Sequence, residues 1–129
     1  MATEFSVILE DEPGTLARLC GALGDAGINI EAIAGSSRGG TSRVQFVCDA
    51  VQRATEILAT AGIPCTTREV LVVRVLDKPG MLGDVALVMS KAEVNIDSVY
   101  VTMRGHVVLG VDDLQGATQV AGGMAVMTD

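Results

Sequence analysis

The chain carries the same turn sequence twice. Asp11-Glu12-Pro13-Gly14 recurs 66 residues later as Asp77-Lys78-Pro79-Gly80. Behind each turn come apolar residues at helical spacing, and then an Asn-Ile pair, which is Asn29-Ile30 in the first copy and Asn95-Ile96 in the second. A period of this length is too long for a solenoid repeat but fits one small α+β unit. The sequence therefore predicts two copies of one domain.

Hydrophobic periodicity predicts the same order of elements in both copies, strand–helix–strand–strand–helix–strand. In the first copy, strands are expected over residues 5–9, 28–34, 44–48 and 65–69, helices over 16–23 and 51–61, and a loop over 35–40. In the second copy, strands are expected over 70–76, 94–103, 107–111 and 124–127, and helices over 82–89 and 114–121. This order is the ferredoxin-like plan, an antiparallel sheet with both helices on one face. We expect an α+β fold of two such units, residues 1–69 and 70–129, joined without a linker.

The second copy departs from the first in three places. Residues 48–54 match residues 111–117 at an offset of 63, so the second hairpin loop has lost three residues. Glu93 replaces the glycine that precedes the Asn-Ile strand, and Gly116 weakens the last helix by propensity. These differences leave open whether two sites, one site or none can function.

The composition excludes several classes of partner. Sixteen acidic residues against nine basic ones give a net charge of −7, which disfavours nucleic acid and anionic membranes. No apolar run approaches the roughly 20 residues that span a bilayer, and no signal peptide is visible at the N-terminus. Only 2% of the residues are aromatic, while the mean hydropathy is +0.44. Such an apolar small chain is expected to bury further surface in a homo-oligomer, most simply a homodimer.

Catalytic and metal chemistry have little support in the sequence. Cys20, Cys48 and Cys65 are widely spaced, which favours buried, inert thiols and a reducing cytoplasm. His106 is the only histidine and is expected at a hairpin. Because neither a nucleophile–base pair nor a metal-ligand spacing is present, we expect no enzyme activity, no metal and no cofactor.

The repeated turn is itself a candidate binding site. Gly14 and Gly80 permit a close approach of the backbone, and the amides that follow have no acceptor inside the helix. Those amides can bind a carboxylate with help from the helix dipole. Asp11 and Asp77 can either accept bonds that close the turn or meet an ammonium group. Turn and capping chemistry alone is the competing explanation.

The two asparagines point in the same direction. Asn disfavours strand interiors, yet Asn29 and Asn95 each lie between apolar residues at a strand entrance. A carboxamide offers a donor and an acceptor, which suits a molecule with both an amine and a carboxylate. The alternative is that each side chain bonds a nearby backbone group.

The run D-x-P-G-x-L, an apolar helix and then G-I-N-I resembles the ACT domain, a ferredoxin-like regulatory module that commonly binds amino acids. The resemblance covers nearly the whole chain as a tandem pair. It implies that a ligand lies between paired domains, held by the first turn of one and the second strand of the other, so that Gly14 would face Asn95 and Gly80 would face Asn29. The implied ligand-binding residues are Asp11, Pro13, Gly14, Thr15, Leu16, Asn29 and Ile30, with Asp77, Pro79, Gly80, Met81, Leu82, Asn95 and Ile96.

The sequence therefore favours a non-catalytic regulatory protein that binds an amino acid between two ACT-like domains and acts on a separate metabolic enzyme. The alternative is a structural module for oligomerisation or docking that binds no ligand itself. The identity of the ligand and of the regulated pathway is left open.

Overall fold

The computed structural model describes residues 1–122 and the strand at 126–127. The chain divides into two compact units. Residues Thr3–Arg68 form the N-terminal unit, and residues 69 onward, together with Met1 and Ala2, form the C-terminal unit.

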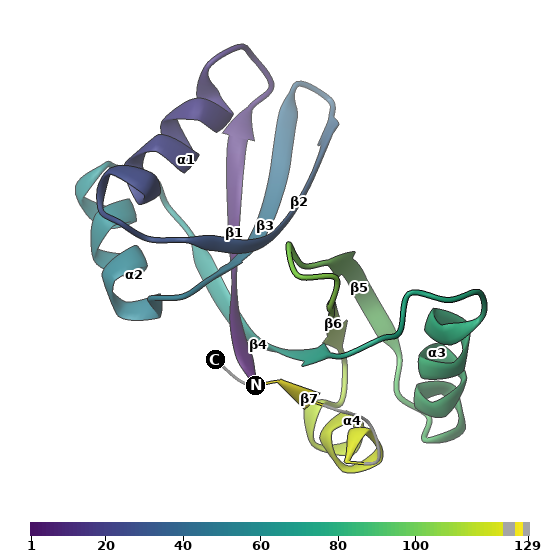
Figure 1. Cartoon of the computed structure of the whole chain (residues 1–129). Helices are drawn as coiled ribbons and strands as arrows, with labels where there is room; N and C mark the ends of the chain where they lie inside the picture. The colour runs from purple at the N-terminus through teal and green to yellow at the C-terminus, as the bar shows by residue number, and fades with distance from the viewer. Residues whose placement is uncertain (123–125, 128–129) are drawn as a thin grey trace. The chain divides into compact units, whose positions relative to one another are not determined.

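The N-terminal unit is a twisted sheet covered by two helices (Figure 1). Its elements are β1 (Ala2–Glu10), α1 (Thr15–Asp25), β2 (Ile30–Arg38), β3 (Thr41–Cys48), α2 (Val51–Thr60) and the start of β4 (Thr66–Val73). Strand β3 lies between β1 and β2 and is antiparallel to both. Strands β1 and β2 therefore run in the same direction, and α1 returns the chain between them.

One face of this sheet holds the core of the unit. Alternate residues of β1 are buried against the two helices, as the period of two in the sequence predicts. Phe5 and Phe46 stack there with ring centroids 5.0 Å apart, beside Leu19 and Leu23 of α1 and Leu58 of α2. The opposite face carries Ser6 and Ile8, and Ile8 is 61% exposed.

The expected loop over residues 35–40 is mostly strand. Strand β2 continues to Arg38, β3 begins at Thr41, and only Gly39 and Gly40 turn the chain. Both glycines have positive φ values, 62° and 89°, which a two-residue hairpin turn requires. The polar residues of this segment pair across the ladder, where the hydroxyl oxygens of Ser37 and Ser42 are 2.6 Å apart. Glycine and serine content alone had indicated a loop, so that prediction was wrong.

The C-terminal unit repeats the order of elements. After β4 come α3 (Met81–Lys91), β5 (Ile96–Val101), β6 (Val107–Val111), α4 (Leu114–Ala121) and β7 (Val126–Met127). Strand β6 lies between β5 and β4, and β7 pairs with the other edge of β4, all antiparallel. The expected last strand is described only at 126–127, while residues 123–125 and 128–129 lie outside the described residues.

The second unit has its own core, and it keeps the turn before β5 and the start of α4 despite its changes in sequence. Leu71, Val85, Met89 and Leu109 are buried together with small residues of α4. Glu93 adopts φ 59° in the position where Gly27 has φ 74°, so the left-handed turn is kept without its glycine. At the start of α4, Asp113 accepts a 3.0 Å hydrogen bond from the N–H of Gly116, where an added Cβ would lie 2.3 Å from a carboxylate oxygen.

One strand joins the two units. The sequence analysis expected separate strands over 65–69 and 70–76, whereas the structure has the single strand β4, Thr66–Val73. No glycine or proline interrupts residues 66–73, and β-branched residues fill most of this run. The chain therefore passes from one unit to the next without leaving the extended conformation. Strand β5, at Ile96–Val101, is also shorter than the expected range 94–103.

Candidate functional site: the glycine turns that begin α1 and α3

The turn after β1 is closed by the backbone and by one hydroxyl. Gly14, the residue before α1, has φ 97° and ψ −17°, a left-handed conformation that only glycine adopts freely. The N–H of Glu12 donates to Glu10 O at 2.9 Å, and the N–H of Asp11 donates to Gly40 O at 3.0 Å. The Thr15 hydroxyl lies 2.8 Å from Glu10 O and 3.1 Å from Glu12 O. Thr15 therefore shapes the turn and is not available as a donor to a ligand.

The turn after β4 has nearly the same geometry. Gly80 has φ 88° and ψ −11°, and the N–H of Lys78 donates to Leu76 O at 2.8 Å. Met81 stands where the first unit has Thr15, so this turn lacks the hydroxyl that closes its counterpart. The backbone alone specifies the turn, and Gly80 is the residue that makes it possible.

Two kinds of polar group remain unused at each turn. Among the described residues, no hydrogen bond or ion pair engages the side chain of Asp11 or Asp77, so the turn-closing role considered for them is not seen. The N–H groups of Leu16 and Ala17, and of Leu82 and Gly83, likewise find no acceptor in the described part of the chain. Each turn thus presents amides that favour a carboxylate beside an acid that favours an ammonium group.

Beside the second turn lies a pocket of about 280 Å³, lined in part by Leu76, Met81 and Asp84. A larger pocket, of about 320 Å³, opens beside the first turn. Its lining comes from β1, the start of α1, β2 and β3, and consists of Leu9, Thr15, Leu16, Ile33, Ala34, Gly35, Ser36, Ser37, Ser42 and Val44. Gly35 is the residue that leaves this space. A Cβ built there would meet Val44 Cγ2 at 3.4 Å, which is ordinary contact distance, so the notch reflects a missing side chain and not a crowded backbone.

In the second unit, a side chain fills the position equivalent to Gly35. Gly35 pairs with Val44 in the β2–β3 ladder, and Val101 pairs with Val107 in the β5–β6 ladder at the same register. A valine side chain therefore stands where the first unit has none. The first turn of α3 also carries Asp84, whereas the first turn of α1 carries no acid. An anion at the second turn would meet both a filled notch and a like charge.

Asn29 and Asn95 are held by a clasp of two hydrogen bonds. The N–H of Asn29 donates to Asp49 Oδ1 at 3.0 Å, and the N–H of Asp49 returns a bond to Asn29 O at 3.2 Å. Asn95 and Asp112 make the same pair at 2.9 and 3.1 Å. The asparagine carboxamides are exposed and take no part in these bonds.

Within the N-terminal unit, the asparagine and the turn lie at opposite ends of the strands. Glu10 and Arg38 both pair with Thr41, whereas Ile30 pairs with Cys48 at the other end of β3. Thr41 and Cys48 are seven positions apart along β3, and at about 3.3 Å per position the two ends are separated by roughly 23 Å. One unit therefore cannot bring Asn29 or Ile30 to the turn at Asp11, Pro13 and Gly14.

The sequence analysis missed Gly35, Asp49 and Asp112. Asp49 and Asp112 were visible as a repeated match, but a lone aspartate after a strand does not reveal its partner. Gly35 was assigned to a loop, so its place opposite Val44 could not be deduced. The remaining expected site residues, Pro79, Leu82 and Ile96, hold the positions of Pro13, Leu16 and Ile30 in the second copy.

The other polar candidates show no catalytic arrangement. Cys48 is fully buried, burial raises the pKa of Cys20, and Cys20, Cys48 and Cys65 form no disulfide with one another. The backbone of His106 closes the β5–β6 hairpin through two hydrogen bonds with Thr102. Among the described residues, no cluster of three or more His, Cys, Asp or Glu could hold a metal ion. None of the described helices is long and apolar enough to cross a membrane.

A family model matches the first of these folds. Residues 3–63, just under half of the chain, match the model of the ACT domain. This segment is thus similar to an ACT domain. It lies within the N-terminal unit and contains the turn at Gly14, the pocket and Asn29. None of the curated proteins compared with the chain matches it significantly.

Solved structures extend the likeness to nearly the whole chain. Protein BT0572 from Bacteroides thetaiotaomicron aligns with a TM-score of 0.90 at 18% identity, over 98% of this chain and 91% of that one. The regulatory subunit of aspartate kinase from Thermus thermophilus, in its ligand-free form, aligns with a TM-score of 0.71 at 19% identity, over 94% and 90%. The same subunit from Thermus flavus gives 0.67 at 19%, over 94% and 90%. At these identities the likeness concerns the fold, which is an ACT-like α+β fold with antiparallel strands.

Proposed function

We propose that this protein is a non-catalytic regulatory module that binds an amino acid through the turn at the start of α1. The observation that carries the proposal is the pairing, at Gly14, of unused helix amides with the unengaged carboxylate of Asp11, beside a pocket. The α-carboxylate would accept from the N–H groups of Leu16 and Ala17, and the α-ammonium group would meet Asp11. The side chain would enter the notch at Gly35.

The proposal includes a second ACT-like domain in the C-terminal unit, with boundaries at residues 1–69 and 70–129. The repeated turn geometry, the repeated Asn–Asp clasp and the same element order support this tandem organisation. Because Val101 and Asp84 disfavour an anion at Gly80, we assign ligand binding to the first turn and a supporting role to the second. Asp77, Pro79, Gly80, Met81 and Leu82 then serve mainly to shape α3.

The proposal also places the ligand between domains. A ligand at the turn of the N-terminal unit needs protein contacts on its other side, and Asn29 and Ile30 of the same unit lie at the far end of the strands. Asn95 and Ile96, or Asn29 and Ile30 of another copy in a homo-oligomer, supply those contacts. Binding would then change how the units or copies pair, and a separate metabolic enzyme would respond to that change. The regulatory subunits among the similar folds support this role.

Calorimetric titration of the full chain with each standard amino acid tests the proposal. We expect at least one to bind, and we expect Asp11→Asn to weaken it about tenfold because a charge-assisted bond is lost. Asp77→Asn is the matched control and should leave the affinity within about twofold, since the second turn is assigned no ligand. If a folded sample binds none of them, the alternative of a structural docking module is favoured instead.

A further inference from the structure

A second pocket lies in the N-terminal unit, and it is distinct from the pocket at the glycine turn. Its volume is about 400 Å³, within the range of small-molecule sites, and its lining is Ser6, Ile8, Arg43, Pro64, Cys65 and Thr66. In the β1–β3 ladder Ile8 pairs with Arg43, and Ser6 and Ile8 point away from the buried residues Phe5, Val7 and Leu9. The pocket is therefore on the sheet face opposite to the helices.

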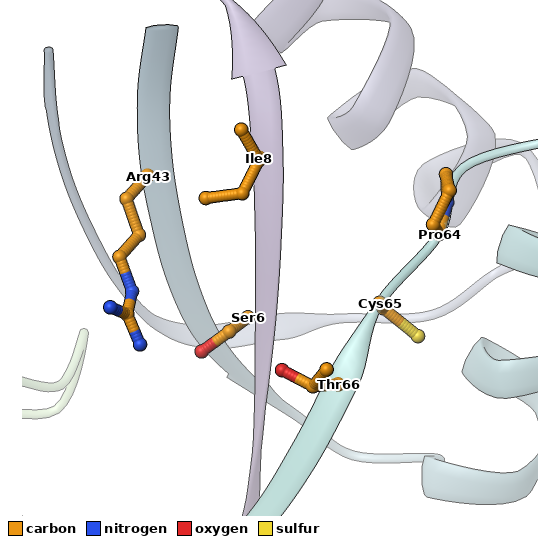
Figure 2. A pocket seen from close by; sticks show the side chains of 6 residues that line it. All are labelled: Ser6, Ile8, Arg43, Pro64, Cys65 and Thr66. Atoms are coloured by element: carbon orange, nitrogen blue, oxygen red, sulfur yellow. The ribbon is translucent and has the colours of Figure 1, made fainter. Parts of the chain in front are cut away.

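The polar groups of this pocket converge on one place. Figure 2 shows the guanidinium of Arg43 extending from β3 toward the hydroxyl of Ser6 on β1, with the hydroxyl of Thr66 pointing toward Ser6 from β4. The thiol of Cys65 points away from Ser6, and Cys65 packs against the helix-side core. The groups offered to a ligand are thus one cation and two hydroxyls, with apolar surface from Ile8 and Pro64.

Arg43 is an unengaged cation in an acidic protein. In the described part of the chain its side chain makes no hydrogen bond or ion pair, whereas Arg68 pairs with Glu4 at 3.2 Å and Arg18 donates to Ala61 O. A guanidinium presents a planar fork of donors that fits a carboxylate in two parallel bonds. The hydroxyls can donate further bonds to the same anion.

The surrounding charges limit which anion fits. Glu4 lies two residues before Ser6 on β1, and Glu10 lies two residues after Ile8, so both are on the same face. The charge of Glu4 is countered by Arg68, but no cation pairs with the Glu10 carboxylate among the described residues. One arginine between these acids suits a single negative charge better than a doubly charged phosphate.

We propose that the pocket formed by Ser6, Arg43 and Thr66 binds a small organic monocarboxylate with a short aliphatic body. The carboxylate pairs with the Arg43 guanidinium and accepts from the two hydroxyls, while Ile8 and Pro64 cover the aliphatic part. This site does not depend on the proposed amino-acid site, because it shares no residue with the lining of the pocket at the turn.

An NMR titration of the full chain with isovalerate tests this proposal. We expect amide shifts at Ser6, Ile8, Arg43 and Thr66 with millimolar affinity, and none at Leu16 or Ala17, so that the two sites are distinguished. Isovaleramide has the same shape without the charge and should bind about tenfold more weakly. Absence of shifts with isovalerate would overturn the proposal. Tighter binding of inorganic phosphate to the same residues would overturn the assignment to a carboxylate.

Two variants and a matched control assign the contact to its residues. Arg43→Gln should weaken isovalerate about tenfold, and Arg53→Gln, which removes an exposed arginine of α2 outside the pocket, should leave it unchanged. Thr66→Val removes a hydroxyl at constant shape in a strand and should weaken binding several-fold. Equal affinity in Arg43→Gln and Arg53→Gln would show that the guanidinium is not the partner of the anion. The amide spectrum of each variant reports whether it is folded.

Discussion

Single residues set the difference between the two turns. The backbones at Gly14 and Gly80 agree within about ten degrees, so the turn itself does not distinguish the units. The difference lies in Gly35 against Val101 and in Arg18 against Asp84. Arg18 donates to Ala61 O at the end of α2, so it also ties α1 to α2. The chemistry around each turn thus depends on one side chain in the first turn of the following helix and on one in the strand after it.

Gly35→Val should abolish the pocket at the first turn and preserve the fold. The added Cβ meets Val44 at contact distance, and valine is favoured in strands, so we expect little loss of stability. Amino-acid affinity, measured by calorimetry, should fall about tenfold or more because the notch is filled. Val101→Gly is the matched variant and should leave that affinity unchanged. An unaltered affinity in Gly35→Val would place the ligand elsewhere.

Glu93→Gly should stabilise the protein. Glu93 has φ 59°, a conformation that costs a non-glycine residue about 1–2 kcal/mol, and part of that cost is offset by the greater freedom of glycine in the unfolded chain. We expect a gain of about 0.5–1 kcal/mol in the free energy of unfolding, measured with urea. Gly27→Ala, the reverse change at the equivalent position, should lose about 1 kcal/mol. A loss of stability in Glu93→Gly would mean that the glutamate side chain makes a stabilising contact.

At the level of elements, both units use the same clasp to fix the entrance to a strand. The Asn–Asp pair joins the residue before β2 to the residue after β3, and its counterpart joins β5 to β6. Both ladders show an irregularity directly after the clasp, between Ile30 and Ala32 and between Ile96 and Ser98. The clasp therefore sets the register at the point where pairing starts, and it presents the asparagine carboxamide to solvent.

Asp49→Ala and Asp112→Ala should each destabilise the protein by about 1 kcal/mol, since each loses a charge-assisted bond at an exposed site. Asp25→Ala serves as the control, because Asp25 is also exposed and its carboxylate has no hydrogen-bond partner among the described residues. Chemical denaturation monitored by circular dichroism gives the three values. Equal stability of Asp49→Ala and Asp25→Ala would contradict the role of the clasp.

The sequence predicted the elements better than it predicted their ends. The order of strands and helices and the glycine turns follow from periodicity and from residues with special backbone freedom. The loop expected over residues 35–40 was wrong, and the two strands expected over 65–69 and 70–76 are the single strand β4. Composition cannot show that Ser37 pairs with Ser42 or that one strand continues into the next. The pocket at Gly35 and the clasp depend on pairing across strands, which one sequence does not reveal.

At the level of the whole molecule, two hydrophobic cores share no residue. One is built around Phe5, Phe46 and Leu58, and the other around Leu71, Met89 and Leu109. Strand β4 is the continuous element that serves both. The units are therefore expected to respond separately to a cavity placed in one core.

Leu58→Ala should destabilise the N-terminal unit by about 2–5 kcal/mol through lost burial and a cavity. Hydrogen exchange should then accelerate for amides of residues 3–68 and much less for residues 69–122, because opening of one core leaves the other intact. Met89→Ala is the matched variant and should give the opposite pattern. Uniform acceleration along the chain in both variants would show that the units unfold as one.

Strand β4 changes character along its length. Leu71 and Val73 belong to the core of the C-terminal unit, and Val70 and Val72, which alternate with them, are buried as well. The C-terminal half of β4 is therefore apolar on both faces, whereas Thr66 and Thr67 in its first half are exposed. A charged side chain is expected to be tolerated at Thr66 or Thr67 and excluded from residues 70–73 on either face.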